Sequence, residues 1–166
     1  MNDRPRCDRS IDSPDPGRTR LLGRSLAQVA GAGTLLLLNG ELGSGKTVLV
    51  KGLAAGLGSE GPVTSPTFVL CSHYRGGRLP LVHMDLFRIP EADIEDAGLD
   101  EPLAAPAVVA VEWPSESLNG LLGGLGGPAI LEVRIAVTGP NRRRICLRAR
   151  SDPARALLAR LGKDHW

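Results

Sequence analysis

A glycine-rich stretch that ends in a lysine and a threonine, GELGSGKT at positions 40–47, contains residue types that could hold phosphate. Gly40, Gly45, Lys46 and Thr47 satisfy the spacing G-x-x-x-x-G-K-[ST], and Gly43 adds a glycine inside the loop. Glycines let the backbone turn its N–H groups toward phosphate oxygens, and a following helix adds its positive N-terminal end. Lys46 could bridge the β- and γ-phosphates, and the Thr47 hydroxyl could coordinate Mg²⁺. The alternative is a strand-to-helix turn without a ligand.

Two acids come where apolar segments of strand type end. Asp85 follows PLVHM, and Glu112 follows AVVAV. Because ligands bind at the carboxyl edge of open α/β sheets, we expect both acids to lie beside the phosphate loop. Phosphoryl transfer needs Mg²⁺ held by a carboxylate and a group that orients the nucleophile, so Lys46, Asp85 and Glu112 are the candidate catalytic residues. Glu112 could hold the metal together with Thr47, or it could hold the attacking water. For each acid, the alternative to a catalytic role is a carboxylate at a strand end that is simply exposed to solvent.

Further polar residues lie between the loop and these acids. The hydroxyls of Thr64, Ser65 and Thr67 surround a proline and could sense a γ-phosphate, but turn chemistry explains them equally well. His83 lies two residues before Asp85, on the same face of a regular strand. A packed, hydrogen-bonded histidine is favoured there over one that transfers protons.

The elements that must position these residues alternate between strands and helices. TLLLLN is too short for a helix and is typical of a strand buried on both faces, after which the phosphate loop leads into a helix. The expected helices cover residues 18–30, 46–57, 91–98 and 152–161. The expected strands cover residues 34–39, 67–74, 80–87, 107–113, 129–137 and 142–150. Residues 1–16 are polar and proline-rich, which predicts a disordered leader before one domain at 17–166.

Composition limits the function classes. The 166 residues are 42% hydrophobic, which fits one compact domain. The apolar runs are far shorter than the ~20 residues of a membrane helix, and the polar start does not resemble a secretory signal, so we expect a cytoplasmic protein. Three scattered cysteines, Cys7, Cys71 and Cys146, favour free thiols. Both ends are rich in arginine, but with 3% aromatic residues there is little surface to stack bases, so strong RNA binding by the chain alone is not expected.

The motifs taken together resemble a known family. GELGSGKT is followed by TSPTF at 64–68, Tyr74, HMDLFR at 83–88 and VEWP at 111–114. Their order and intervals are similar to those of TsaE, the small bacterial ATPase of tRNA threonylcarbamoyladenosine synthesis. The segment T-x-x-L-G at 19–23 resembles the first helix of that family. Phe87 departs from the pattern, because the family usually has tyrosine there.

The resemblance implies an α/β, P-loop NTPase-like fold with three layers and a mixed parallel and antiparallel sheet. It implies ATP and Mg²⁺ as cofactors, with Thr47 and Glu112 at the metal and Asp85 nearby as a second acid. The residues expected to bind the nucleotide are Thr19, Glu41, Leu42, Gly43, Ser44, Gly45, Lys46 and Thr47.

The resemblance also implies protein partners. In that family the ATPase joins TsaD, which transfers the threonylcarbamoyl group to the tRNA adenosine beside the anticodon, and TsaB, the partner of TsaD. The chain would meet tRNA through this complex and would hydrolyse ATP slowly alone and faster with its partners. The nucleotide would act as a conformational switch, with the TSPTF loop as the moving part.

Two other functions stay open. A small P-loop kinase would pass the γ-phosphate to a metabolite or nucleoside, but it usually needs an arginine-bearing lid, and the only arginine cluster, at 142–144, lies in an expected hairpin. A binding module with a structural nucleotide would keep ATP intact. Phosphate transfer to an added acceptor would identify the kinase, and intact ATP in the presence of partners would identify the binding module.

Overall fold

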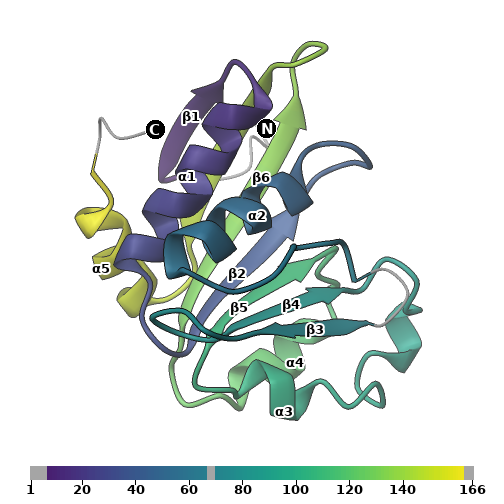
Figure 1. The fold of residues 1–166 in the computed structure, drawn as a ribbon. Coiled ribbons are helices and arrows are strands. Elements are labelled where there is room, and N and C mark those ends of the chain that lie inside the picture. Colours follow the sequence, from purple (N-terminus) through teal and green to yellow (C-terminus); the bar gives the residue numbers. More distant parts are fainter. Residues whose placement is uncertain (1–6, 67–69, 163–166) are drawn as a thin grey trace.

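The structure is a computed structural model that describes residues 7–66 and 70–162. In these residues seven strands form one sheet in the order β1-β7-β6-β2-β5-β4-β3 (Figure 1). The strands β6, β2, β5 and β4 run parallel to one another, whereas β1, β7 and β3 pair antiparallel with their neighbours. The strand bounds are β1 Arg9–Ser13, β2 Thr34–Asn39, β3 Cys71–Tyr74, β4 Leu81–Asp85, β5 Val108–Glu112, β6 Ala129–Val137 and β7 Arg143–Ala149.

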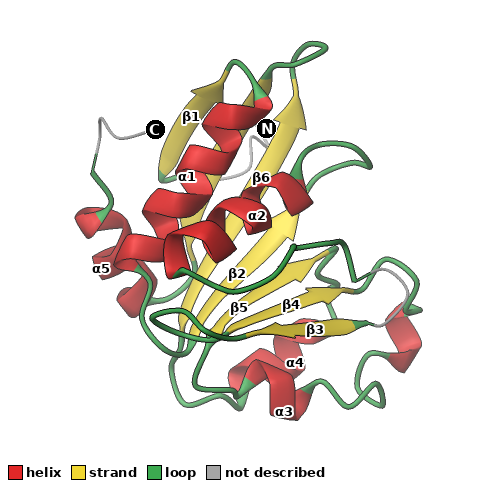
Figure 2. Ribbon diagram, viewed as in Figure 1, coloured by secondary structure: helices red, strands yellow, loops and turns green. Residues whose placement is uncertain are grey.

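Helices cover both faces of the sheet (Figure 2). Helices α1, α2 and α5 pack with one apolar cluster, and α3 and α4 pack with a second cluster on the opposite face. The helix bounds are α1 Pro16–Val29, α2 Lys46–Leu57, α3 Asp100–Leu103, α4 Leu118–Gly123 and α5 Asp152–Arg160, with a 3₁₀ turn η1 at Glu91–Asp93. The expected α/β architecture with three layers and a mixed sheet is therefore confirmed.

The strand before the phosphate loop lies at the centre of the sheet. Leu36 and Leu38 enter the cluster under α1 and α2, and Leu35 and Leu37 enter the opposite cluster. Alternate side chains of a strand point to opposite faces, so a strand with helices on both sides must be apolar throughout. This burial fixes the end of β2, and with it the start of the loop.

The first segment of the chain differs from the expected disordered leader. Residues 9–13 form β1, which pairs antiparallel with β7, and Ile11 and Ser13 are buried there. Only one large apolar residue lies in this strand, so it has no alternating pattern that would reveal it. Pairing with the edge of β7 decides its structure. Residues 1–6 of the expected leader lie outside the described part of the chain.

The cysteines also differ from the expectation of three free thiols. The pairing of Ser10 with Cys146 brings the start of β1 against β7, and Cys7 forms a disulfide with Cys146. Their Cα atoms are 5.6 Å apart, within the usual range for a disulfide. Because 139 positions separate the two residues, their spacing in the sequence gives no sign of this proximity. Cys71 is the free cysteine among the described residues.

Three smaller differences from the expected elements lie between residues 67 and 123. The expected helix at 91–98 is a single 3₁₀ turn, and the short helices α3 and α4 form where no element was expected. Leu118 and Leu122 of α4, one turn apart, are both buried in the second cluster. Tertiary burial therefore stabilises α4 despite its two glycines. Part of the expected strand at 67–74 lies outside the described residues, and β3 covers its second half.

Helices α1 and α2 approach so closely that their backbones touch at glycines. A Cβ atom at Gly52 of α2 would overlap the carbonyl oxygen of Arg20 and lie 3.0 Å from the Cα atom of Gly23, both in α1. The phosphate loop leads directly into α2, so this contact also fixes the direction of the helix that follows the loop.

We expect Gly52→Ala to lower the free energy of unfolding by about 2 to 3 kcal/mol, because the overlap is with rigid backbone. Chemical denaturation at two or more temperatures measures this change. Gly31→Ala is the matched control, because no atom lies within 4 Å of a Cβ atom built there. Equal stability of the two variants would contradict the close contact.

Among the described residues, no helix is both long enough and apolar enough to cross a membrane.

Candidate active site

The loop between β2 and α2 is held in a conformation that requires glycine. Gly45, the residue before α2, has a φ of 108°, a left-handed value that other residues rarely adopt. A Cβ atom at Gly40 would lie 2.5 Å from the Ser44 hydroxyl oxygen and 2.6 Å from the carbonyl oxygen of Ile135. Helix α2 begins at Lys46, so its unpaired N-terminal N–H groups open into the loop. The local backbone therefore has the form of an anion-binding loop.

Lys46 folds back over the loop. Its Nζ donates hydrogen bonds to the carbonyl oxygens of Gly40 at 2.7 Å and Glu41 at 3.1 Å. The same nitrogen lies 3.9 Å from the ring centroid of Trp113, a cation–π contact. Burial lowers the pKa of Lys46, and the carboxylates of Glu112, Asp85 and Glu41 act in the opposite direction.

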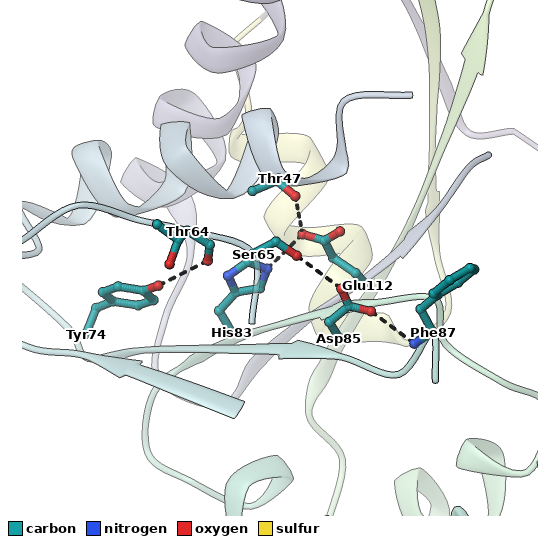
Figure 3. A network of polar contacts seen from close by, with 8 residues as sticks. All are labelled: Thr47, Thr64, Ser65, Tyr74, His83, Asp85, Phe87 and Glu112. Atoms are coloured by element: carbon teal, nitrogen blue, oxygen red, sulfur yellow. Dashed lines mark hydrogen bonds and ion pairs between the residues drawn. The ribbon is translucent and has the colours of Figure 1, made fainter. Parts of the chain in front are cut away.

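Glu112, at the end of β5, joins the loop helix to the sheet. Its Oε1 accepts a hydrogen bond from the Thr47 hydroxyl at 2.9 Å and contacts Nε2 of His83 at 2.8 Å (Figure 3). A carboxylate only accepts, so Nε2 carries the proton of this bond. Both Glu112 and His83 are buried. The expectation of a packed, hydrogen-bonded His83 is confirmed. Its partner is Glu112, one of the two carboxylates that the sequence marks as candidate catalytic residues.

Asp85, at the end of β4, contacts a different set of groups. Its Oδ2 accepts a hydrogen bond from the Ser65 hydroxyl at 3.1 Å, and its Oδ1 accepts one from the backbone N–H of Phe87 at 3.0 Å (Figure 3). Tyr74 donates to the carbonyl oxygen of Thr64 at 3.4 Å. Asp85 thus connects the sheet edge to the segment at 64–66, while Thr67 and Phe68 of the TSPTF motif lie outside the described residues.

Strand register explains why the two acids lie side by side. In the parallel pairing of β4 with β5, Asp85 is opposite Glu112, and in the pairing of β2 with β5, Leu38 is opposite Glu112. All three strands therefore end at one edge of the sheet, where the phosphate loop begins. The sequence predicted this convergence from the strand ends, and the structure brings Lys46, Thr47, Asp85 and Glu112 together around it.

A cavity of about 570 Å³ opens at this edge. Its walls include Lys46, Thr47, Ser65, Asp85, Glu112 and Trp113. Of the other residues expected to bind nucleotide, Leu42, Gly43 and Gly45 also line the cavity.

Three expected nucleotide-binding residues have other surroundings. Thr19 is buried behind the loop, where its hydroxyl bonds to that of Ser13 at 2.8 Å. The carbonyl oxygen of Glu41 accepts from Lys46, and the side chain of Ser44 is fully buried.

One aromatic residue of the site was not singled out from the sequence. Trp113 follows Glu112 and has a φ of 56°, a left-handed value that is uncommon for a bulky residue. Its ring covers Lys46 and lies 4.8 Å from the ring of Phe87, centroid to centroid. No local pattern predicts such a backbone angle, and the VEWP motif shows only that a tryptophan comes next to the acid.

Comparisons with known proteins agree with this geometry. A family model described as "Threonylcarbamoyl adenosine biosynthesis protein TsaE" matches residues 13–145. A Synechocystis protein named tRNA threonylcarbamoyladenosine biosynthesis protein TsaE is 44% identical over 108 residues, covering 61% of this chain and 67% of the relative. A Nostoc protein of the same name is 40% identical over 119 residues, covering 65% and 74%. The crystal structure of Bacillus subtilis YdiB matches with a TM-score of 0.74 and 31% identity, covering 92% of this chain and 93% of that chain.

Fold and loop together define the class. A parallel strand, a glycine loop and a helix, set in a mixed sheet with helices on both faces, make this a P-loop NTPase-like fold. Within that class, the chain belongs to the TsaE family.

Proposed function

We propose that the chain binds Mg-ATP and hydrolyses it in support of a complex with TsaD and TsaB that modifies tRNA with a threonylcarbamoyl group. The observation that carries this proposal is the 2.9 Å hydrogen bond from the Thr47 hydroxyl to Glu112, directly beside Lys46. A hydroxyl that donates its proton to a carboxylate keeps its lone pairs for a cation. The names of the relatives, each a tRNA threonylcarbamoyladenosine biosynthesis protein, supply the pathway.

The residues present fit a nucleotide and a divalent cation. A Cβ atom at Gly43 would meet nothing within 4 Å, so the exposed side of the loop has room for phosphate oxygens. Lys46 already uses its donors on carbonyl oxygens, and phosphate oxygens are stronger acceptors that can replace them. Mg²⁺ is usually held by one or two carboxylates together with substrate phosphates, which fits Thr47 with Glu112 and Asp85 nearby.

The chain's own residues would have distinct tasks in hydrolysis. Bound Mg²⁺ would offset the negative charge of the phosphates. Glu112 is held by Thr47 and His83, so its carboxylate stays at the sheet edge, where it can hold the metal or orient a water. Asp85 accepts a hydrogen bond from Ser65, so cleavage of the γ-phosphate can change the position of the segment at 64–66. The cation–π contact of Trp113 keeps Lys46 over the loop.

The kinase alternative has less support. The guanidinium group of Arg143 donates to carbonyl oxygens of the loop, and Arg144 pairs with Asp12 on the surface. Neither Arg143 nor Arg144 lines the cavity. The binding module differs from the proposed ATPase in turnover alone, so a turnover measurement separates these two functions.

The test is phosphate release from Mg-ATP by the purified chain, first alone and then with TsaD, TsaB and tRNA. We expect slow release alone and faster release in the mixture, because a switch ATPase can complete its site with a partner's group. The Lys46→Ala variant serves as the control and should show no stimulation. Intact ATP in every mixture would contradict the proposal and leave the binding module, and phosphate found on an added acceptor would favour the kinase.

A further inference from the structure

Arg143, the first residue of β7, contacts the phosphate loop through its guanidinium group. Its Nε donates a hydrogen bond to the carbonyl oxygen of Ser44 at 2.8 Å, and its Nη2 donates one to that of Gly43 at 3.1 Å. Its Nη1 donates to the carbonyl oxygens of Gly139 at 3.1 Å and Arg142 at 2.9 Å, in the turn between β6 and β7. A single guanidinium group thus joins the phosphate loop to that turn.

We propose that Arg143 is a positioning residue that presets the phosphate loop for anion binding; this rests on the nucleotide binding proposed above. A trans peptide unit is planar, and its C=O and N–H groups point in opposite directions. When Arg143 holds the carbonyl of Ser44, the N–H of Gly45 must therefore point to the opposite side. The N–H of Ser44 donates to the carbonyl oxygen of Glu41 at 3.1 Å and closes the turn of the loop.

The tip of the loop, at Leu42 and Gly43, has few side-chain contacts. A Cβ atom at Gly43 would have no neighbour within 4 Å, and the side chain of Leu42 is 81% exposed. Side-chain packing therefore acts on the loop at Ser44, whose side chain is buried, and leaves the carbonyl of Gly43 to be oriented by hydrogen bonds. Two consecutive carbonyl oxygens on one edge of a planar guanidinium group define the orientation of both units at once.

The chemistry favours arginine over lysine at this position. A lysine carries three donors on one nitrogen and cannot hold two carbonyl oxygens with a fixed planar edge while also binding the turn. Among the described residues, no carboxylate forms an ion pair with Arg143. Its charge therefore adds to the positive potential at the loop, which an anionic ligand would meet.

The test compares Arg143→Met and Arg143→Lys with Arg144→Met as the matched control. Arg144 is the next residue in β7, and its side chain is 61% exposed. Its Nε lies 2.9 Å from Oδ1 of Asp12, another exposed side chain. Hydrogen–deuterium exchange of the nucleotide-free protein measures the loop at residues 40–48 directly. We expect exchange there to be about fivefold faster or more in both Arg143 variants, with unchanged exchange in the sheet, because two charge-assisted hydrogen bonds are lost.

Calorimetric titration with Mg-ATP provides the second measurement. We expect Arg143→Met to bind about tenfold more weakly or worse, Arg143→Lys to be weakened nearly as much, and Arg144→Met to bind as the unchanged protein does. Unchanged exchange at the loop, or exchange that rises equally throughout the chain, would overturn the positioning role. Unchanged affinity in both Arg143 variants would do the same. If the unchanged protein itself fails to bind Mg-ATP, the proposed function is lost, and the exchange data still decide whether Arg143 holds the loop.

Discussion

Lys46→Ala is expected to weaken Mg-ATP binding about 100-fold or more and to abolish phosphate release. The variant loses the cation that would bridge the terminal phosphates, and no other lysine lines the cavity in the described residues. Isothermal titration calorimetry measures the affinity, and a coupled phosphate assay measures the release. Lys51→Ala is the control, because Lys51 is an exposed lysine of the same helix.

The same variant separates binding from folding. Burial lowers the pKa of Lys46, which means that the folded protein is a worse environment for this charge than water. Removing the charge therefore removes a desolvation cost and leaves the free energy of unfolding within about 1 kcal/mol of its original value, although two hydrogen bonds to loop carbonyls are lost. Unfolding by denaturant without nucleotide tests this balance. Retained affinity in Lys46→Ala would refute the role of the lysine, and an unfolded variant would show that the lysine holds the loop.

Glu112→Ala is expected to keep Mg-ATP binding within about fivefold and to lower hydrolysis about 1,000-fold. The phosphate contacts come from the loop and Lys46, whereas Glu112 would act on the metal or the attacking water. Glu112→Gln is the sharper variant, because an amide oxygen can still accept from Thr47 and His83 while the negative charge is lost. Binding by calorimetry and single-turnover hydrolysis should be measured on the same preparations.

A matched control for this experiment is Glu116→Gln, an exposed acid four residues further along the chain. This substitution should change neither the affinity for Mg-ATP nor the rate of hydrolysis by more than about twofold. Full hydrolysis in Glu112→Gln would remove Glu112 from the mechanism and leave Asp85 as the candidate acid. Loss of binding together with hydrolysis would instead show that the carboxylate mainly holds the cation.

Local patterns in the sequence predicted the elements that carry the site. The run LLLL at 35–38 is wholly apolar, and the glycines and lysine of the loop follow it closely, so strand, loop and helix could all be assigned from neighbouring residues. The positions of Asp85 and Glu112 could also be predicted, because each acid ends an apolar segment and parallel strands share their carboxyl edge. The general place of the site followed from these short-range features.

The remaining features depend on contacts between distant parts of the chain. Strand β1 forms because β7 offers it an edge, and the Cys7–Cys146 disulfide follows from that pairing. The left-handed backbone of Trp113 and the hydrogen bonds from Arg143 to the loop likewise depend on the folded surroundings. No periodicity or spacing encodes them, so they could be found only from the structure.

The pairing of β2 also has a consequence for synthesis on the ribosome. Thr34, at the start of this strand, pairs with Val108 of β5 on one side and with Ala129 of β6 on the other. A nascent chain that already exposes GELGSGKT therefore lacks both strands that support the loop until most of the sequence has emerged. Contacts of such long sequence separation form late in folding. An unfinished chain thus carries the motif without the site, and nucleotide binding becomes a property of the almost completed protein.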